Sequence, residues 1–392
     1  MTSHSSPGTL RVESIRSWTE LDAVRGEWDA LLAASDAATA FLSYPWVQSW
    51  RDVFGGAGTP LVLLCRSDAG VIRGIAPLFI CTVAPLRLLR AVRFIGDLRS
   101  ESGNLDVIAE RGYEATVVDA VLTALEGMRD LWDLLELRHV ARESCALGHL
   151  RAGAMERGWL IEERSSPHLI IDLASSWEAV LARMSRNGRK AATHTDRNLP
   201  SAGVVESRHC ERREDLPYFF DALFRLHTER WTARGELGNL RDPERRAFYQ
   251  RLALRFLECG QLDFDLLELN GAPVAAHFGF RYATTYYQLE SGFDPAYARF
   301  GTGVGLTSRV IRRVIADGIA HYDFLEGDEP YRLRWSPRIS RYVHLRMARP
   351  RTRGAGYMTA IRAGARWRNA VRERYPRLWG LAHRARGRTS AS

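Results

Sequence analysis

A glycine-rich segment in the second half of the chain has the residue types needed to bind a phosphate-bearing ligand. Gly301, Gly303 and Gly305 follow a predicted strand and precede a predicted helix over 306–317. Glycine lets backbone amides approach a ligand closely, and the start of a helix supplies unpaired N–H donors and the positive end of its dipole. These glycines, with Arg299 beside them as a charge partner, predict a cradle for a pyrophosphate.

A dinucleotide-binding loop is the alternative interpretation of these glycines, and their spacing argues against it. Its fingerprint is Gly-x-Gly-x-x-Gly directly after a parallel strand. Here the spacing is Gly-x-Gly-x-Gly, and about ten residues separate the first glycine from the preceding strand. The earlier strands are joined by an Asn270-Gly271 hairpin turn and not by a helix. We therefore exclude a Rossmann-type site.

Four side chains in the same half are candidates for proton transfer. Glu290 ends the strand that precedes the glycines, and Asp323 lies on the following strand, where a hydrogen-bonding role in the core is the alternative. His227 lies on a predicted helix, and its ordinary pKa of about 6.5 suits a general base, with a structural role as the alternative. Tyr331 is the fourth candidate. No Ser-His-Asp or Cys-His arrangement is evident, and no cluster of histidines and cysteines predicts a metal site.

Basic residues near these candidates suit an anionic substrate. Lys190 is the single lysine of the chain and lies with several arginines on a predicted helix over 176–198. This helix predicts a substrate groove, with a solvated basic face as the alternative. Arg230 and Trp231 lie beside His227 on the predicted helix over 216–234, and we expect both to contact the substrate.

The elements that must position these residues repeat once along the chain. Each half has two strands joined by a short glycine-containing turn, at 62–80 and 264–281. Each half later has a strand with the pattern aromatic-Asp-apolar-Leu-Glu, at 132–136 and 322–326. Segments with helical periodicity separate these strands. The order predicts an α+β fold with mixed central sheets flanked by helices, and the repeat indicates an ancient duplication.

Length and composition describe a globular protein of two domains. The chain has 392 residues, of which 46% are hydrophobic and 26% charged. Its five cysteines are scattered singly, as small buried hydrophobic residues would be. The N-terminal segment is polar, and prolines and an arginine interrupt the longest apolar run, 75–89. We therefore expect no signal peptide and no membrane span, and a soluble cytoplasmic protein.

The net charge of +9 belongs to the C-terminal tail. Twelve of the 55 basic residues and one of the 46 acidic residues lie in 349–392, so the first 348 residues carry a net charge of −2. Bulky residues recur in the tail at helical spacing: Tyr357, Ile361, Trp367, Val371, Tyr375, Leu378 and Trp379. The tail predicts a basic amphipathic helix that contacts the inner face of the membrane or, alternatively, packs on the protein body. A nucleic acid partner is disfavoured because the body is nearly neutral.

A series of motifs between residues 15 and 345 resembles the GNAT-like family named for the cellulose-biosynthesis protein CelD, which is structurally akin to the Fem-type transferases. The motifs are Phe41-x-Ser-x-Pro-Trp46, Gly74-Ile-Ala-Pro-Leu78, Phe94-Ile-Gly96, Ser185-Arg-Asn-Gly-Arg-Lys190, Leu226-His-Thr-Glu-Arg-Trp231, Ser291-Gly-Phe-Asp-Pro295, Tyr322-Asp-Phe-Leu-Glu-Gly327, and Tyr331-Arg332 with Trp335. The family usually has a lysine where this chain has Arg332. Arginine can neutralise a phosphate or carboxylate there, but it cannot transfer a proton near neutral pH.

The resemblance implies two GNAT-like domains in tandem: a degenerate domain over 1–173 that shapes the acceptor cleft, and an acyltransferase domain over 174–348, followed by the tail over 349–392. It implies transfer from an acyl-CoA, with acetyl-CoA as the expected donor and no metal, to an amine of a cell-envelope, polysaccharide or secondary-metabolite precursor. Backbone groups at Gln288 and Leu289 would hold the pantetheine, and Arg332 would contact the acceptor.

Two alternatives to this function stay open. A Fem-type enzyme would take its acyl group from an aminoacyl-tRNA, and a non-catalytic partner in exopolysaccharide assembly would bind no donor. The sequence leaves the acyl group, the acceptor, which residue is the general base and the oligomeric state undetermined.

Overall fold

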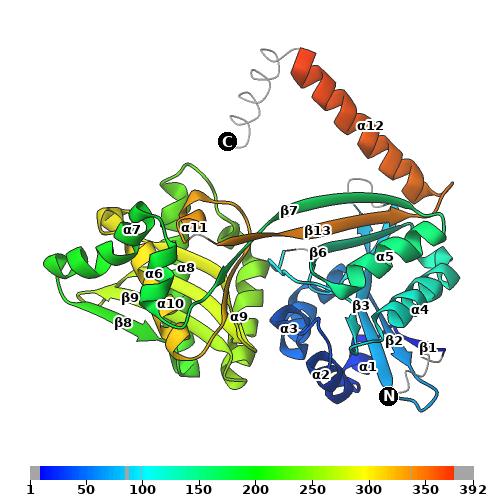
Figure 1. The fold of residues 1–392 in the computed structure, drawn as a ribbon, viewed down its shortest axis with the longest axis horizontal. Helices are drawn as coiled ribbons and strands as arrows, with labels where there is room; N and C mark the ends of the chain where they lie inside the picture. The colour runs from blue at the N-terminus through cyan, green and yellow to red at the C-terminus, as the bar shows by residue number, and fades with distance from the viewer. Residues whose placement is uncertain (1–8, 84–87, 98, 336, 375–392) are drawn as a thin grey trace.

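Thirteen strands form one continuous sheet that runs through both halves of the protein. The computed structural model describes residues 9–83, 88–97, 99–335 and 337–374. The strand order is β1-β2-β3-β4-β6-β13-β7-β12-β11-β10-β9-β8, and β5 pairs with β3. Figure 1 shows the two halves at opposite ends of the long axis, with helices on both faces of each part of the sheet.

The N-terminal half is built on a hairpin followed by a parallel crossover. Strands β2 and β3 form the hairpin, β4 continues it, and α4 crosses over to β6, which pairs with β4 in parallel. The elements are β1 (Arg11–Ile15), α1 (Trp18–Asp22), α2 (Arg25–Ala33), α3 (Tyr44–Phe54), β2 (Gly58–Arg66), β3 (Ile72–Val83), β4 (Leu89–Phe94), β5 (Ile108–Ala109), α4 (Glu114–Gly127), β6 (Leu134–Ala141) and α5 (Cys145–Glu156).

The C-terminal half repeats this order. Hairpin β9-β10 is followed by β11, helix α10 and a parallel strand β12. The elements are α6 (Trp177–Arg183), α7 (Arg186–Asn198), β8 (Val205–His209), α8 (Leu216–Thr232), α9 (Pro243–Glu258), β9 (Leu262–Leu269), β10 (Ala272–Tyr282), β11 (Thr285–Phe293), α10 (Thr302–Ala316), β12 (His321–Glu326) and α11 (Pro330–Leu333). The predicted repeat is therefore present in the strand order itself.

Two long strands, β7 (Leu160–Asp172) and β13 (Arg338–Ala348), join the halves (Figure 1). They pair with each other along the full length of β13. Residues 342–347 of β13 also pair with β6, while the far end of β7 pairs with β12. The sequence predicted mixed central sheets flanked by helices, and the structure joins them into one continuous sheet, because β13 pairs with both β6 and β7. The domain limits at 173 and 348 stay predictions.

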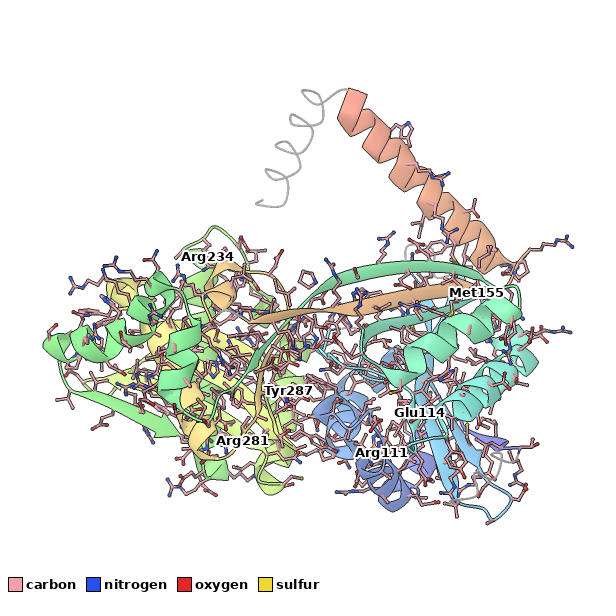
Figure 2. The ribbon with its side chains drawn as sticks, viewed as in Figure 1. Arg111, Glu114, Met155, Arg234, Arg281 and Tyr287 are labelled. Carbon is pink, nitrogen blue, oxygen red and sulfur yellow. The ribbon has the colours of Figure 1, made fainter. Side chains whose placement is uncertain are left out.

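An aromatic seam packs the two halves against each other. The ring of Phe41 lies 5.6 Å from that of Phe280 and 5.3 Å from that of Tyr287, and Trp46 lies 5.2 Å from Phe248. All five side chains are buried, and Figure 2 shows Tyr287 where the halves meet. Edge-to-face aromatic contacts of this kind add to the hydrophobic gain of burial. The motif that begins at Phe41 thus holds the cleft between the halves in place.

Two predicted helices differ from the observed ones. The helix predicted over 176–198 is broken between α6 and α7, where Ser185 caps α7 by accepting a hydrogen bond from the Gly188 amide at 3.1 Å. Helix α10 begins at Thr302 and not at 306. Gly303 and Gly305 therefore lie within the first turns of the helix and not in a loop.

Helix α12 (Arg353–Arg374) begins on the body and then leaves it (Figure 1). Met358 is fully buried, and the Arg362 guanidinium donates to the Ile161 carbonyl at 2.7 Å. Trp367 is 67% exposed. The side chain of Val371, and Tyr375, Leu378 and Trp379, lie outside the described residues, so the membrane contact of the tail stays a prediction. No helix over the described residues has both the length and the hydrophobicity to cross a bilayer.

Candidate active site

The parallel strands β11 and β12 separate after a short paired stretch. Residues 285–287 pair with 321–323, and no further pair between the two strands follows. On its other side β11 carries a bulge at Leu289, because Phe278 is opposite Glu290 while Gly279 is opposite Gln288. A bulge re-aims side chains and leaves backbone groups unpaired. The separated strand therefore offers free backbone groups beside Gln288 and Leu289, the two positions predicted to hold pantetheine.

A cavity of about 230 Å³ lies where β11 meets the start of α10. It is lined by Arg230, Arg234, Ser291, Gly292, Phe293, Ala298, Gly301, Thr302, Gly303, Val304, Thr307, Tyr331, Arg334 and Trp335. Three arginines and no acidic residue line it, and the first-turn amides of a helix have no partners within the helix. The Thr302 hydroxyl is buried here without a hydrogen-bond partner. The positive charge and the unpaired N–H and O–H groups of this cavity suit an anionic ligand such as a pyrophosphate. We call it the donor cavity, after the acyl donor that the sequence predicts at these glycines.

The three glycines of this segment have different roles. Gly301 has a φ of +67°, which favours glycine at the helix cap. A Cβ atom on Gly303 would lie 3.1 Å from the Phe293 ring, inside the donor cavity. A Cβ atom on Gly305 would lie 2.4 Å from Thr195 of α7. Gly305, predicted as a cofactor-binding residue, instead permits close packing of two helices.

A Gly305→Val variant is expected to lose at least about 2 kcal/mol of free energy of unfolding, because the added atoms overlap Thr195 in a packed core. Urea unfolding followed by circular dichroism measures this loss. Gly148→Val is the matched control, since a Cβ atom there meets nothing within 4 Å. Unchanged stability combined with lost ligand binding would instead assign Gly305 to the donor site.

A second cavity of about 400 Å³ adjoins the donor cavity. It is lined by Glu101, Arg230, Trp231, Glu236, Leu237, Gly238, Asn239, Gln288, Leu289, Glu290, Ser291, Glu326, Glu329, Tyr331 and Arg332. Arg230, Ser291 and Tyr331 line both cavities, and Arg230 Nη1 donates to the carbonyl and the hydroxyl of Ser291 at 3.1 Å. Five glutamates and two arginines line this second cavity. We call it the acceptor cavity, after the acyl acceptor of the predicted reaction.

Glu290 has the position and the pKa of a general base in the acceptor cavity. Its residue is 8% exposed, and burial raises its pKa to about 7, with the Glu101 carboxylate adding to the rise. Oε1 accepts hydrogen bonds from Asn239 Nδ2 at 2.8 Å and from the Tyr249 hydroxyl at 3.2 Å. Among the described residues nothing donates a hydrogen bond to Oε2. That oxygen is therefore available to take a proton near neutral pH.

His227 lies behind Glu290 and outside the lining of both cavities. Its Nε2 is 3.6 Å from Glu290 Oε2, and its side chain is 2% exposed. Burial, together with the positive charge of Arg230, lowers the pKa of His227 to about 4. A histidine with so low a pKa is a weak base at neutral pH. The geometry thus favours Glu290 over His227, both of which the sequence offered as candidates.

Asp323 holds the sheet together and lines neither cavity. Both of its carboxylate oxygens lie 2.9 Å from His168 Nε2, and the Leu325 amide donates to Oδ1 at 2.7 Å. His168 stacks on Tyr342 of β13 at 4.1 Å. The geometry does not support the proton-transfer role predicted for Asp323. It matches the alternative of a hydrogen-bonding role in the core.

Tyr331 and Arg332 of α11 lie at the junction of the cavities but act differently. Tyr331 lines both cavities, with the Arg230 guanidinium 5.2 Å from its ring centre. Arg332 donates to the carbonyls of Phe324 and Glu326 at 2.9 and 2.6 Å, and to the Tyr331 hydroxyl at 3.0 Å. Arg332 therefore positions Tyr331 and the end of β12, in addition to lining the acceptor cavity.

Lys190 lies on the donor side and not on the acceptor side. It lines a further cavity of about 490 Å³ with Arg299, Arg334, His194 and the outer face of the α10 start. No acidic residue lines that cavity. Lys190 was predicted to contact the substrate groove, whereas Arg230 and Trp231 do line the acceptor cavity. Arg299 lines this further cavity and not the donor cavity, so its role as a charge partner stays a prediction.

Several residues around Glu290 were not identified from the sequence. Asn239 and Tyr249 orient Glu290 from a turn and from α9, and Glu101 enters from the N-terminal half with a φ of +55°. A polar residue after Gly238 marks a turn but gives no indication of its partner. Folding of the C-terminal half brings Asn239 and Tyr249 to the Glu290 carboxylate, and the packing of the two halves adds Glu101.

Comparison with known proteins identifies the class of fold. A family model described as an acetyltransferase (GNAT) domain matches residues 186–333. The structure is similar to that of FemX, with a TM-score of 0.59 at 12% identity over 84% of this chain and 96% of that one. It is also similar to a conserved protein of unknown function from Bacteroides thetaiotaomicron, with a TM-score of 0.56 at 15% identity over 86% and 100%. L-PGS from Bacillus licheniformis gives a TM-score of 0.51 at 12% identity over 86% and 96%.

The chain therefore has the GNAT fold, and the predicted fold class is confirmed. Residues 186–333, which match the acetyltransferase (GNAT) domain model, contain the lining of both candidate cavities except for Glu101, Arg334 and Trp335. At these identities the structural likeness shows the fold alone. No curated protein matches the sequence. The finer resemblance to the CelD-type family stays a prediction.

Proposed function

We propose that this protein is an acyl-CoA-dependent N-acyltransferase of the CelD type that acts on an amine of a cell-envelope, polysaccharide or secondary-metabolite precursor. One observation carries the proposal. A cationic cavity at a helix N-terminus and an acid-rich cavity meet at Arg230, Ser291 and Tyr331, beside a carboxyl group whose pKa is about 7. The first cavity suits the pyrophosphate of an acyl-CoA, and the second suits an amine, which arrives as a cation.

The reaction follows from this geometry. The thioester would lie along the free edge of β11, where backbone amides near the Leu289 bulge would stabilise the oxyanion. Glu290 Oε2 takes a proton from the ammonium group, and the neutral amine attacks the thioester carbon. The C–N bond forms, and the C–S bond breaks as the tetrahedral intermediate collapses. The leaving thiolate takes a proton from the Tyr331 hydroxyl, and the proton that the nitrogen of the intermediate loses passes to the resulting tyrosinate. Glu290 then releases its proton to solvent.

Thermal unfolding with and without millimolar acetyl-CoA tests the donor assignment. A ligand at about 100 times its dissociation constant adds roughly 2.7 kcal/mol to the stability of the folded state, so the midpoint of unfolding is expected to rise by several degrees. Succinyl-CoA and a long-chain acyl-CoA belong in the same series, because the acyl group is unknown. If none of these thioesters raises the midpoint, the acyl-CoA assignment is wrong.

A second candidate function is transfer from an aminoacyl-tRNA. The basic surface outside the donor cavity, formed by Lys190, Arg299 and Arg334, favours it, because such a surface suits a longer polyanion than CoA. FemX shares the fold, as does the C-terminal domain of a putative lysylphosphatidylglycerol synthetase from Agrobacterium fabrum, with a TM-score of 0.51 at 10% identity over 87% of this chain and 96% of that domain. Transfer of a labelled amino acid from charged tRNA, without acyl-CoA, would select this function.

A further inference from the structure

A second carboxylate of the acceptor cavity, Glu326, is held by two irregular strands. In β6, Val140 pairs with Val343 of β13 and Leu137 pairs with Leu345, so β6 has one more residue than β13 between these pairs. His139 lies in this bulge and has a φ of +56°. In β12 an extra residue precedes Glu326, where Leu325 has a φ of +62°. Positive φ is costly for residues such as leucine and is found where a structure enforces it.

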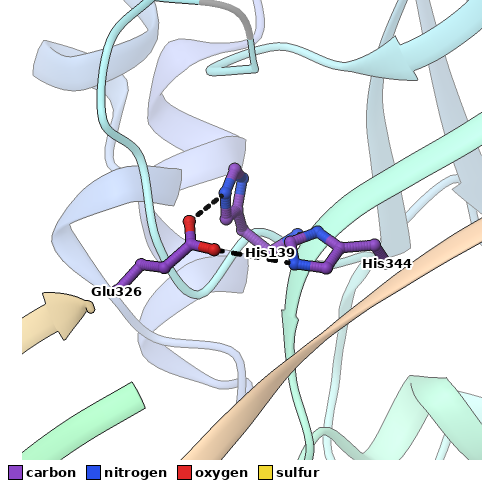
Figure 3. Close-up of side chains that lie close together, drawn as sticks. All are labelled: His139, Glu326 and His344. Carbon is purple, nitrogen blue, oxygen red and sulfur yellow. Dashed lines mark hydrogen bonds and ion pairs between the residues drawn. The ribbon is translucent and has the colours of Figure 1, made fainter. Parts of the chain in front are cut away.

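The two bulges bring together side chains that are far apart in the sequence. Figure 3 shows Glu326 of β12 between His139 of β6 and His344 of β13. Glu326 Oε2 is 2.9 Å from His139 Nε2, and Oε1 is 3.9 Å from His344 Nε2. Bulges commonly aim side chains into functional sites. Here they hold one carboxylate at the wall of the acceptor cavity.

The hydrogen bonds of this cluster do not suit a metal ion. The His139 amide donates to His344 Nδ1 at 3.2 Å, so neutral His344 carries its proton on Nε2, which lies 2.9 Å from the Ser166 hydroxyl. A histidine that binds metal through Nε2 donates its Nδ1 proton to a neighbouring acceptor. In His344 the roles are exchanged, because Nδ1 accepts a hydrogen bond and Nε2 carries the proton. His139 Nδ1 is buried and has no hydrogen-bond partner among the described residues. The cluster instead fixes the charge of Glu326.

Glu326 and Glu290 differ in charge at neutral pH although they line the same cavity. Hydrogen bonding from His139, with a further contribution from Ser166, lowers the pKa of Glu326 to about 2. Burial lowers the pKa of His344 to about 4, so His344 adds no positive charge there near neutral pH. Two carboxyl groups whose surroundings move their pKa values apart usually have separate roles. Near neutral pH Glu326 is therefore charged, and it lines the same cavity as Glu290, which can take up a proton.

The acceptor cavity offers more hydrogen-bond acceptors than its own donors satisfy. Glu101 pairs with Arg245 and Glu329 with Arg332, whereas Glu236 and Glu326 have no arginine partner among the described residues. Of these two, Glu326, whose side chain is 41% exposed, is held in place by His139 and His344, with a hydrogen bond from Ser166. Within the part of the chain that the structure describes, Asn239 Oδ1 is buried without a donor, and Oε2 of Glu290, whose side chain is 9% exposed, receives no hydrogen bond. A ligand rich in N–H groups would satisfy these atoms.

We propose that the acceptor carries two amino groups, one that attacks the donor beside Glu290 and a second, charged one that pairs with Glu326. The substrate class is thus a diamine or a molecule with two separated primary amines. The inference rests on the proposed function for the role of the attacking amine. Binding of the second ammonium group to Glu326 requires no donor and can be measured without one.

Isothermal titration of the purified full chain with α,ω-diaminoalkanes of three to seven carbons, each compared with the monoamine of equal length, tests the proposal. At least one diamine is expected to bind about tenfold tighter than its monoamine, as a charge-assisted hydrogen bond allows. Glu326→Gln, which keeps the shape of the side chain, is expected to remove that preference. Glu156→Gln, an exposed position on α5, is the control for net charge and is expected to retain it.

The outcomes separate this inference from the proposed donor. Equal affinity of every diamine and its monoamine, or a preference that survives Glu326→Gln, would overturn it. Acetyl-CoA is titrated independently into the same preparation. If acetyl-CoA does not bind while the Glu326-dependent preference is present, the acyl-CoA donor is wrong and the two-amine acceptor stands.

Discussion

A Glu290→Gln variant is expected to lose acyl transfer by a factor of about 10² to 10⁴ while it remains folded, the range typical for removal of a general base. Glutamine keeps the shape of the side chain, and its Oε1 can still accept hydrogen bonds from Asn239 and Tyr249. Its amide cannot take a proton at the position of Oε2. Steady-state rates with acetyl-CoA and an amine acceptor measure the loss, and Glu156→Gln, remote from both cavities, is the control.

The pH profile gives this prediction a second readout. For the wild-type enzyme kcat/KM is expected to rise with pH through about 7, because Glu290 must lose its proton before it can act as a base. The variant is expected to lose that titration. A variant with the wild-type rate and the wild-type profile would exclude Glu290 as the base and return the role to another group.

Although the Glu290→Gln variant is expected to lose activity, its free energy of unfolding above pH 7 is expected to exceed that of the wild type. The pKa of Glu290 is raised in the folded state, so the stability that its bound proton contributes is present at low pH and is lost as the pH rises through about 7. Glutamine has no charge to bury. Above pH 7 the variant is therefore expected to be more stable than the wild type, by at most about 3 kcal/mol. Urea unfolding at pH 5.5 and pH 8.5 measures this difference.

A Gly303→Asp variant is expected to weaken acetyl-CoA binding by at least about 100-fold. The carboxylate would enter the donor cavity, where like charges a few ångströms apart repel by several kcal/mol at the effective dielectric of a protein surface. An acidic residue in the first turn of α10 suits the helix dipole, so the fold is expected to persist. Isothermal titration with acetyl-CoA measures the affinity.

Gly148→Asp is the matched control, because a Cβ atom at that exposed helix position meets nothing within 4 Å. Its affinity for acetyl-CoA is expected to equal that of the wild type. Undiminished binding in Gly303→Asp would place the donor elsewhere. If Gly303→Asp binds no acetyl-CoA but retains full function in the cell, the protein is a non-catalytic partner and not a transferase.

Local patterns in the sequence determined the order of the elements and the fold class. A strand needs alternating apolar residues, a hairpin needs a turn such as Asn270-Gly271, and a helix start can be marked by glycines near a strand end, so each leaves a signal within a few residues. Glu290 was identified in this way, because its place at the end of a strand and before the glycines is a property of neighbouring residues.

Only the tertiary structure determined which residues line each cavity and which pack in the core. The sequence placed Lys190 with the acceptor and treated Gly305 as a ligand contact, whereas packing between helices α7 and α10 assigns the first to the donor side and the second to the core. A helix periodicity indicates that a face is buried but not which partner buries it, and long-range packing sets that choice.

The surroundings of Glu326 are the clearest case of a site that sequence patterns do not indicate. Its partners His139 and His344 lie on strands that pair only because β13 crosses to the N-terminal half, and the two bulges that aim these side chains leave no pattern in the sequence. Register is decided by contacts between strands more than a hundred residues apart, and one extra residue in a strand turns the following side chains to the other face. The sequence therefore determined the fold class and included Glu290 among its candidates for the base, and only the assembled sheet determined the acceptor site.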